Sequence, residues 1–133
     1  MFETALNLFV AGVARLGEFH AYVVEKAGLP VTVTTDAQAC TPPFILIQPA
    51  NAVFTLNGGM SKCMFAVTLV LPFLGGGVED VLHAIDLFCT NLYSAVRRDA
   101  SGCMLTAITT TEITESDERK GLWAIGINLE FMA

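Results

Sequence analysis

Apolar residues recur at helical spacing in two parts of the chain. From residue 2 to about residue 26 they lie three and four positions apart, and Gly28 and Pro30 follow. Glycine just after the last turn and proline soon after it are typical of a helix end. From Val78 to about Arg98 one face is apolar, with acidic residues first and arginines last, which suits the helix dipole. The spacing predicts one helix in each part.

The remaining chain has the pattern of strands joined by turns. Leu122–Met132 is the most regular, because large apolar residues alternate there with smaller or polar ones. Asn57-Gly58-Gly59 is a turn signal. The predicted strands are Val31–Thr35, Phe44–Gln48, Val53–Leu56, Lys62–Pro72, Cys103–Ile113 and Leu122–Met132.

The order of these elements is α-β-β-β-β-α-β-β. A run of strands interrupted by one helix and closed by a hairpin is typical of the α+β class. The length of 133 residues suits one domain. We therefore predict a single domain over residues 1–133, with a mostly antiparallel sheet and two helices packed on one of its faces.

Charge is nearly absent from the middle of the chain. Between Ala37 and Val78 the only charged residue is Lys62, and Phe44–Ile47 is a continuous apolar run. Of the whole chain 53% is hydrophobic and 15% is charged, against about 25% charged in average proteins. A chain this short has little interior. Part of this apolar surface is therefore expected to contact other copies of the chain or another protein.

The uncharged stretch does not predict a membrane span. Prolines and side-chain amides interrupt residues 37–61, and Met64–Val78 is shorter than the ~20 residues that a span needs. Arg15 and Glu18 break the first apolar segment, so no signal peptide is expected. A net charge of −6 without a basic patch argues against tight nucleic-acid binding.

Residues that could carry chemistry form no recognisable motif. His20 and His83 are interpreted as structural or exposed residues, and Gly75-Gly76-Gly77 as a flexible connection without a phosphate-binding signature. Without CxxC or zinc-ligand spacing, the cysteines are expected to be buried reduced thiols. They are Cys40, Cys63, Cys89 and Cys103. We predict no enzymatic activity, no metal and no cofactor.

Taken together, residues 2–132 resemble the tail terminator (tail completion) proteins of long-tailed bacteriophages and tail-like particles. The resemblance lies in the order of parts. An N-terminal helix and the segment Thr41-Pro42-Pro43 lead into the strand FILIQP. The strand and turn AVFTLNGG, the strand MFAVTLVLP, the helix VEDVLHAIDLFCTNLYSAV and a final β-hairpin follow.

The resemblance implies a structural virion protein. Such proteins form a ring, usually a hexamer, that caps the finished tail tube, stops its polymerisation and provides the surface that joins the head. The implied partners are other copies of the chain, the tail tube protein and a head-side connector protein, while DNA passes through the channel without specific binding. The implied location is the head-proximal end of the virion tail, after assembly in the host cytoplasm.

Two sets of residues are candidates for these contacts. The charged turn of the last hairpin, otherwise interpreted as a solvated loop, is expected to contact the tube, the connector or the channel lumen. Its residues are Glu115, Asp117, Glu118, Arg119 and Lys120. Apolar strand residues are expected to form the contacts between subunits. They are Phe44, Ile45, Val53, Phe54 and Phe65.

Three other interpretations stay open at the level of sequence. A head–tail connector or stopper subunit would have the same composition. A small oligomeric enzyme or ligand-binding protein would need polar groups such as His20, His83 or Arg97 to converge on a pocket. A cytosolic scaffold without a virus connection would need only the apolar contact surface.

Overall fold

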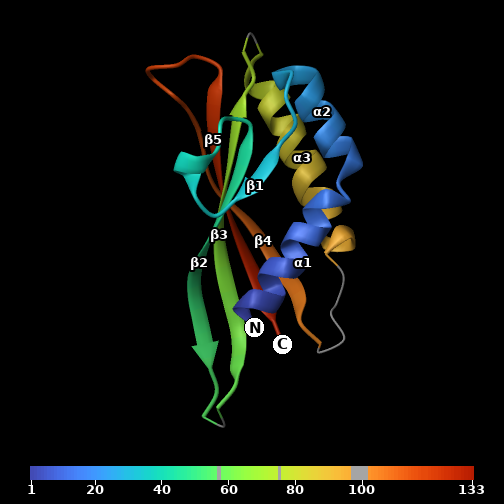
Figure 1. Cartoon of the computed structure of the whole chain (residues 1–133), viewed down its shortest axis with the longest axis vertical. Coiled ribbons are helices and arrows are strands. Elements are labelled where there is room, and N and C mark those ends of the chain that lie inside the picture. The colour runs from blue at the N-terminus through green and yellow to red at the C-terminus, as the bar shows by residue number, and fades with distance from the viewer. Residues whose placement is uncertain (57, 75, 97–101) are drawn as a thin grey trace.

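The computed structural model describes residues 1–56, 58–74, 76–96 and 102–133 (Figure 1). The α-helices are α1 (Phe2–Ala14), α2 (Gly17–Ala27) and α3 (Val78–Ala95). The strands are β1 (Thr32–Thr34), β2 (Phe44–Phe54), β3 (Met60–Pro72), β4 (Met104–Glu115) and β5 (Leu122–Met132), and a short 3-10 helix, η1 (Ala37–Ala39), precedes β2. The predictions that fell on Asn57, Gly75, Arg97 and Arg98 lie outside the described residues.

The five strands form one sheet in the order β1-β2-β3-β5-β4. β1 pairs with β2 in parallel, and the other neighbours are antiparallel. All three helices lie on the same side of the sheet (Figure 1). The predicted α+β class, the mostly antiparallel sheet and the one-sided helix layer are confirmed.

The predicted helix over residues 2–26 is two helices, because the chain breaks at Arg15 and Leu16. The amide of Gly17 donates to the carbonyl of Arg15 at 2.9 Å, which closes a tight turn between α1 and α2. The His20 Nε2 atom lies 2.7 Å from the Val13 carbonyl at the end of α1, which also accepts from the Leu16 amide at 3.1 Å. The break lets Leu16 and the face of α2 that holds Phe19 turn into the core.

The two strands predicted over Phe44–Gln48 and Val53–Leu56 are one strand, β2. The pairing of β2 with β3 shifts register between Pro49 and Asn51, and the ladder continues to Phe54, two residues short of the predicted end. Proline lacks an amide proton and is accommodated at bulges and sheet edges. The bulge therefore lets β2 extend beyond the helix layer (Figure 1).

The hydrophobic core lies between the helices and one face of the sheet. Every second residue of β3 from Cys63 to Leu71 is buried, as are alternate residues of β5 from Ile125 to Phe131. Phe88 of α3 contacts the rings of Phe9 and Phe19, with centroid separations of 6.4 and 5.2 Å. This aromatic cluster connects the three helices.

The opposite face of the sheet carries no helix among the described residues. Its central positions hold small or neutral side chains that are half-buried, such as Ala66, Thr68, Gly126 and Asn128. Within the described ranges, no helix is long and apolar enough to cross a membrane.

Candidate functional site

An apolar arm projects from one end of the molecule. The β2–β3 hairpin extends past the helices in Figure 1, and its tip presents three large apolar side chains to solvent. Val53 is 49% exposed, Phe54 is 67% exposed and Leu56 is fully exposed at 106%. We call these three residues the apolar arm. Its exposed side chains have the chemistry of a contact with another molecule.

The backbone of the arm is held by a tight turn. The amide of Thr55 donates to the carbonyl of Gly59 at 2.8 Å, and the amide of Gly58 donates to the carbonyl of Thr55 at 3.1 Å. Gly58 has a φ of 88°, a left-handed conformation that favours glycine. The hydroxyl of Ser61 donates to the Val53 carbonyl at 3.2 Å across the hairpin. The apolar side chains are therefore displayed on an ordered scaffold.

Three of the five predicted subunit contacts are covered within the single chain. Phe44, Ile45 and Phe65 are only 7%, 0% and 3% exposed within a single chain, and Ile45 and Phe65 belong to its core. The Phe65 ring contacts the ring of Phe2 at a centroid separation of 5.5 Å. Val53 and Phe54 remain candidates. Sequence reasoning did not single out the exposed Leu56, although an apolar residue beside a glycine turn was a usable signal.

The charged turn lies at the other end of the long axis (Figure 1). Asp117, Glu118, Arg119 and Lys120 are exposed there. Glu115 is half-buried, and its Oε2 accepts from the amide of Gly121 at 2.9 Å. Its Oε1 lies 3.8 Å from Lys120 Nζ. Glu115 therefore shapes the turn, and the other four predicted residues are the ones open to a partner.

Gly121 fixes this turn, and its replacement by alanine is expected to cost about 1–3 kcal/mol of unfolding free energy. Its φ is 85°, and an added Cβ would lie 2.9 Å from Leu74 Cα and 3.1 Å from the Phe73 carbonyl oxygen. Backbone atoms cannot move aside as a flexible side chain can. Urea denaturation of Gly121→Ala measures the effect.

The matched control is Gly17→Ala. A Cβ at Gly17 would meet no atom within 4 Å, and the residue begins a helix. That variant should be neutral or slightly more stable than the parent. Equal stability of the two variants would contradict the structural role of Gly121.

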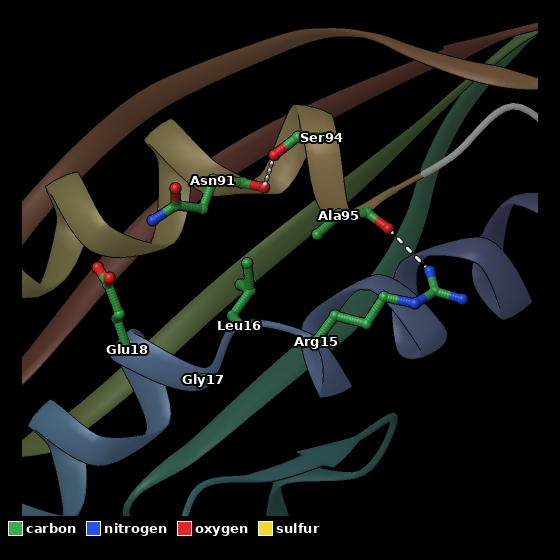
Figure 2. A pocket seen from close by; sticks show the side chains of 7 residues that line it. All are labelled: Arg15, Leu16, Gly17, Glu18, Asn91, Ser94 and Ala95. Atoms are coloured by element: carbon green, nitrogen blue, oxygen red, sulfur yellow. Dashed lines mark hydrogen bonds between the residues drawn. The ribbon is translucent and has the colours of Figure 1, made fainter.

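A hollow lies where α1, α2 and the end of α3 meet (Figure 2). It has a volume of about 400 Å³ and is lined by Arg15, Leu16, Gly17, Glu18, Asn91, Ser94 and Ala95. Figure 2 shows Arg15 Nη1 donating to the carbonyl of Ala95, at 2.9 Å. Asn91 donates to Leu87 and Ser94 to the carbonyl of Asn91, both at 3.0 Å. The polar side chains of Arg15, Asn91 and Ser94 therefore donate to backbone carbonyl groups of α3.

The two histidines have separate structural contacts. His20 bonds the end of α1, as described above. The His83 ring meets the Tyr22 ring at a centroid separation of 4.6 Å. The Tyr22 hydroxyl donates to Asp80 Oδ1 at 3.3 Å, and burial followed by the charge of Asp80 raises the pKa of Tyr22. This contact network connects α2 to α3. Arg97, the third candidate for a converging site, lies outside the described residues.

The cysteines differ in accessibility. Cys63 and Cys103 are buried, whereas Cys40 and Cys89 are half-buried, so the expectation of four buried thiols holds for two of them. Burial raises the pKa of the Cys89 thiol to about 11, with the charge of Asp86 adding to the shift. Across the part of the chain that the structure describes, no three His, Cys, Asp or Glu side chains are grouped to bind a metal.

No protein-family model matches the chain, and no curated protein matches it in sequence. The surfaces and the order of elements therefore carry the functional argument.

Proposed function

We propose that this protein is a structural subunit of a phage tail or a tail-like particle. Copies of it form a ring, with six copies as the expected number, on the completed end of the tail tube. The ring stops further polymerisation and provides the surface to which the head-side connector binds. DNA passes through its channel.

The observation that carries this proposal is the chemical difference between the two ends of the molecule. An uncharged apolar arm lies at one end of its long axis and an exposed charged turn lies at the other (Figure 1). A subunit in a cap must contact its neighbours and also two different proteins, one on each side of the ring. Two chemically unlike surfaces, each ordered by backbone hydrogen bonds, suit such a subunit because little further ordering is needed on binding.

The order of elements supports the same proposal. A bent N-terminal helical segment, the proline-rich segment before β2, the long β2–β3 hairpin, one long helix and a final hairpin follow one another in the chain. The resemblance of the sequence to tail terminators lies in this same order of elements. A connector or stopper subunit shares these requirements, so the test must separate the two.

Tube polymerisation tests the proposal directly. The tube protein encoded by the same genome is allowed to polymerise with and without this protein, and the particles are imaged by negative stain. A terminator should add a ring of density to one tube end and prevent elongation from that end. Tubes that grow normally and carry no extra density would contradict it, and binding only to connector particles would favour the stopper subunit.

Charge reversal of the exposed turn should block head joining. In a variant with Arg119→Glu and Lys120→Glu, two cations that face solvent become anions, and we expect joined particles to fall at least tenfold. Stability should change by only about 0.5 kcal/mol, because both substituted side chains are exposed and the Lys120–Glu115 separation is long, at 3.8 Å. Electron microscopy counts joined particles and thermal denaturation checks the fold.

Glu25→Lys is the control for that experiment, because it reverses the charge of an exposed residue on α2 instead of the turn. It should leave joining unchanged. A normal yield of joined particles from the double variant would remove the charged turn from the proposed contact.

A further inference from the structure

A second apolar surface lies at the start of β2, at the opposite end of that strand from the apolar arm. It is an open groove of about 370 Å³ between the end of α2 and the segment before β2. Leu29, Pro30, Cys40, Pro42 and Pro43 contribute most of its lining, and no charged residue lines it. We call it the proline groove. Leu29 on its rim is 52% exposed.

The arm of a molecule cannot fill the proline groove of the same molecule. β2 runs from Phe44, beside the groove, to Phe54, in the arm. A strand of this length spans about 33 Å at the usual rise per residue. The two surfaces are therefore held apart by a strand paired along its length with β3. An arm can enter a groove only if it comes from another molecule.

The groove and the arm match in size, and neither surface carries a charged residue. A cavity of about 150 Å³ holds a benzene ring, so 370 Å³ accommodates the Phe54 ring with a neighbouring aliphatic side chain. Residues 37–61, which supply both the arm and half of the groove, contain no charge.

Edge-to-edge pairing of two sheets is disfavoured as a route to association. β2 has a proline and two register shifts beyond its short contact with β1. β4 also has two register shifts, and its Ile108 amide donates to the Tyr93 hydroxyl at 2.9 Å. Bulges and covered amides protect edge strands from further pairing. Side-chain insertion by the arm remains the better-supported contact.

We propose that the apolar arm of one copy inserts into the proline groove of the next copy. The contact is head-to-tail, because the two surfaces differ, and such contacts close into rings when the rotation between copies permits. The inference rests on the proposed function in one respect: it supplies the contact by which the ring is built.

The contact area explains why assembly would depend on a ring or a tube. The three arm side chains can bury on the order of 250–300 Å². A stable interface buries about 800 Å² per partner. One arm in one groove is therefore too small to hold a dimer. A closed ring gives every copy two such contacts, and a tube end adds a third surface.

An introduced thiol in the arm tests the proposal, because the groove already holds Cys40. Leu56 is fully exposed in the parent, so the Leu56→Cys variant should fold normally. The variant is oxidised with copper phenanthroline at high protein concentration, alone and with tail tubes. We expect a ladder of linked species larger than dimers on non-reducing gels. Peptide mass spectrometry should find position 56 joined to Cys40 of another copy.

The other native thiols should contribute little. Cys63 and Cys103 are buried. Cys89 has a pKa of about 11, so at pH 8 only about one thiol in a thousand is the reactive thiolate. Adding Cys40→Ser to Leu56→Cys should abolish the ladder. Leu74→Cys is the matched control for placement, since Leu74 is 62% exposed but lies away from the arm.

If the only bond formed joins position 56 of one copy to position 56 of another, the products are dimers alone. This result would overturn the proposal. So would the absence of a bond to Cys40 both with and without tubes. Capping of tubes without this bond would leave the proposed function standing and remove the arm contact. A ladder through Cys40 from a protein that ignores tubes would keep the arm contact and remove the terminator function.

Discussion

Phe88→Ala is expected to lower the unfolding free energy by about 3–5 kcal/mol, because it opens a cavity in the centre of the helix layer. Phe88 is fully buried and contacts Phe9 of α1 and Phe19 of α2. Its removal takes away a partner of both rings at once. Native domains are stable by only about 5–15 kcal/mol, so this single change should bring the protein close to unfolding at ordinary temperature.

Urea denaturation followed by circular dichroism measures the loss. Phe88→Leu is the matched control, since it keeps the position apolar and should cost less than half as much as alanine. Val24→Ala on the exposed side of α2 should change stability little, because Val24 is 45% exposed. A cost below about 1 kcal/mol for Phe88→Ala would show that the three helices do not depend on this cluster.

Phe54→Asp combined with Leu56→Asp is expected to abolish ring formation and tube capping while leaving the monomer folded. Both side chains are exposed in the single chain, so carboxylates at these positions remain solvated and cost little stability. In an apolar groove the same carboxylates would lose their water without gaining a partner. Each should cost several kcal/mol at the contact, which weakens association at least a hundredfold.

Native mass spectrometry and negative-stain imaging with tail tubes measure the outcome. Val24→Asp is the control, since it places a carboxylate on an exposed apolar position of α2. It should assemble like the parent. Rings or capped tubes from the arm variant, at the parent's yield, would show that subunits associate through another surface.

The uncovered face of the sheet is the next surface to consider. Its central side chains are small and neutral, and its flanks carry the Lys62–Glu130 ion pair at 3.1 Å and the exposed Glu112. This face is therefore neutral at its centre and charged towards its flanks.

Local periodicity sufficed for much of the fold. The alternation in Leu122–Met132 corresponds to β5 at both ends, and the apolar face of the second predicted helix corresponds to α3. These elements have one covered face and one open face, so the spacing of their apolar residues directly reflects the burial of each position. The near-absence of charge between Ala37 and Val78 predicted an apolar contact surface, and Val53, Phe54 and Leu56 of this stretch are exposed.

The chain by itself thus determined the α+β class, the places of its main elements and the existence of an apolar surplus. Only the tertiary structure decided which apolar residues form that surplus. Phe44, Ile45 and Phe65 have the same chemistry as Val53 and Phe54, but the former are covered within the chain and the latter lie beyond the helices. Burial depends on where strands and helices end relative to one another. The bulge after Pro49 and the break at Arg15 set those ends, and both depend on contacts between segments distant in sequence or separated by a turn.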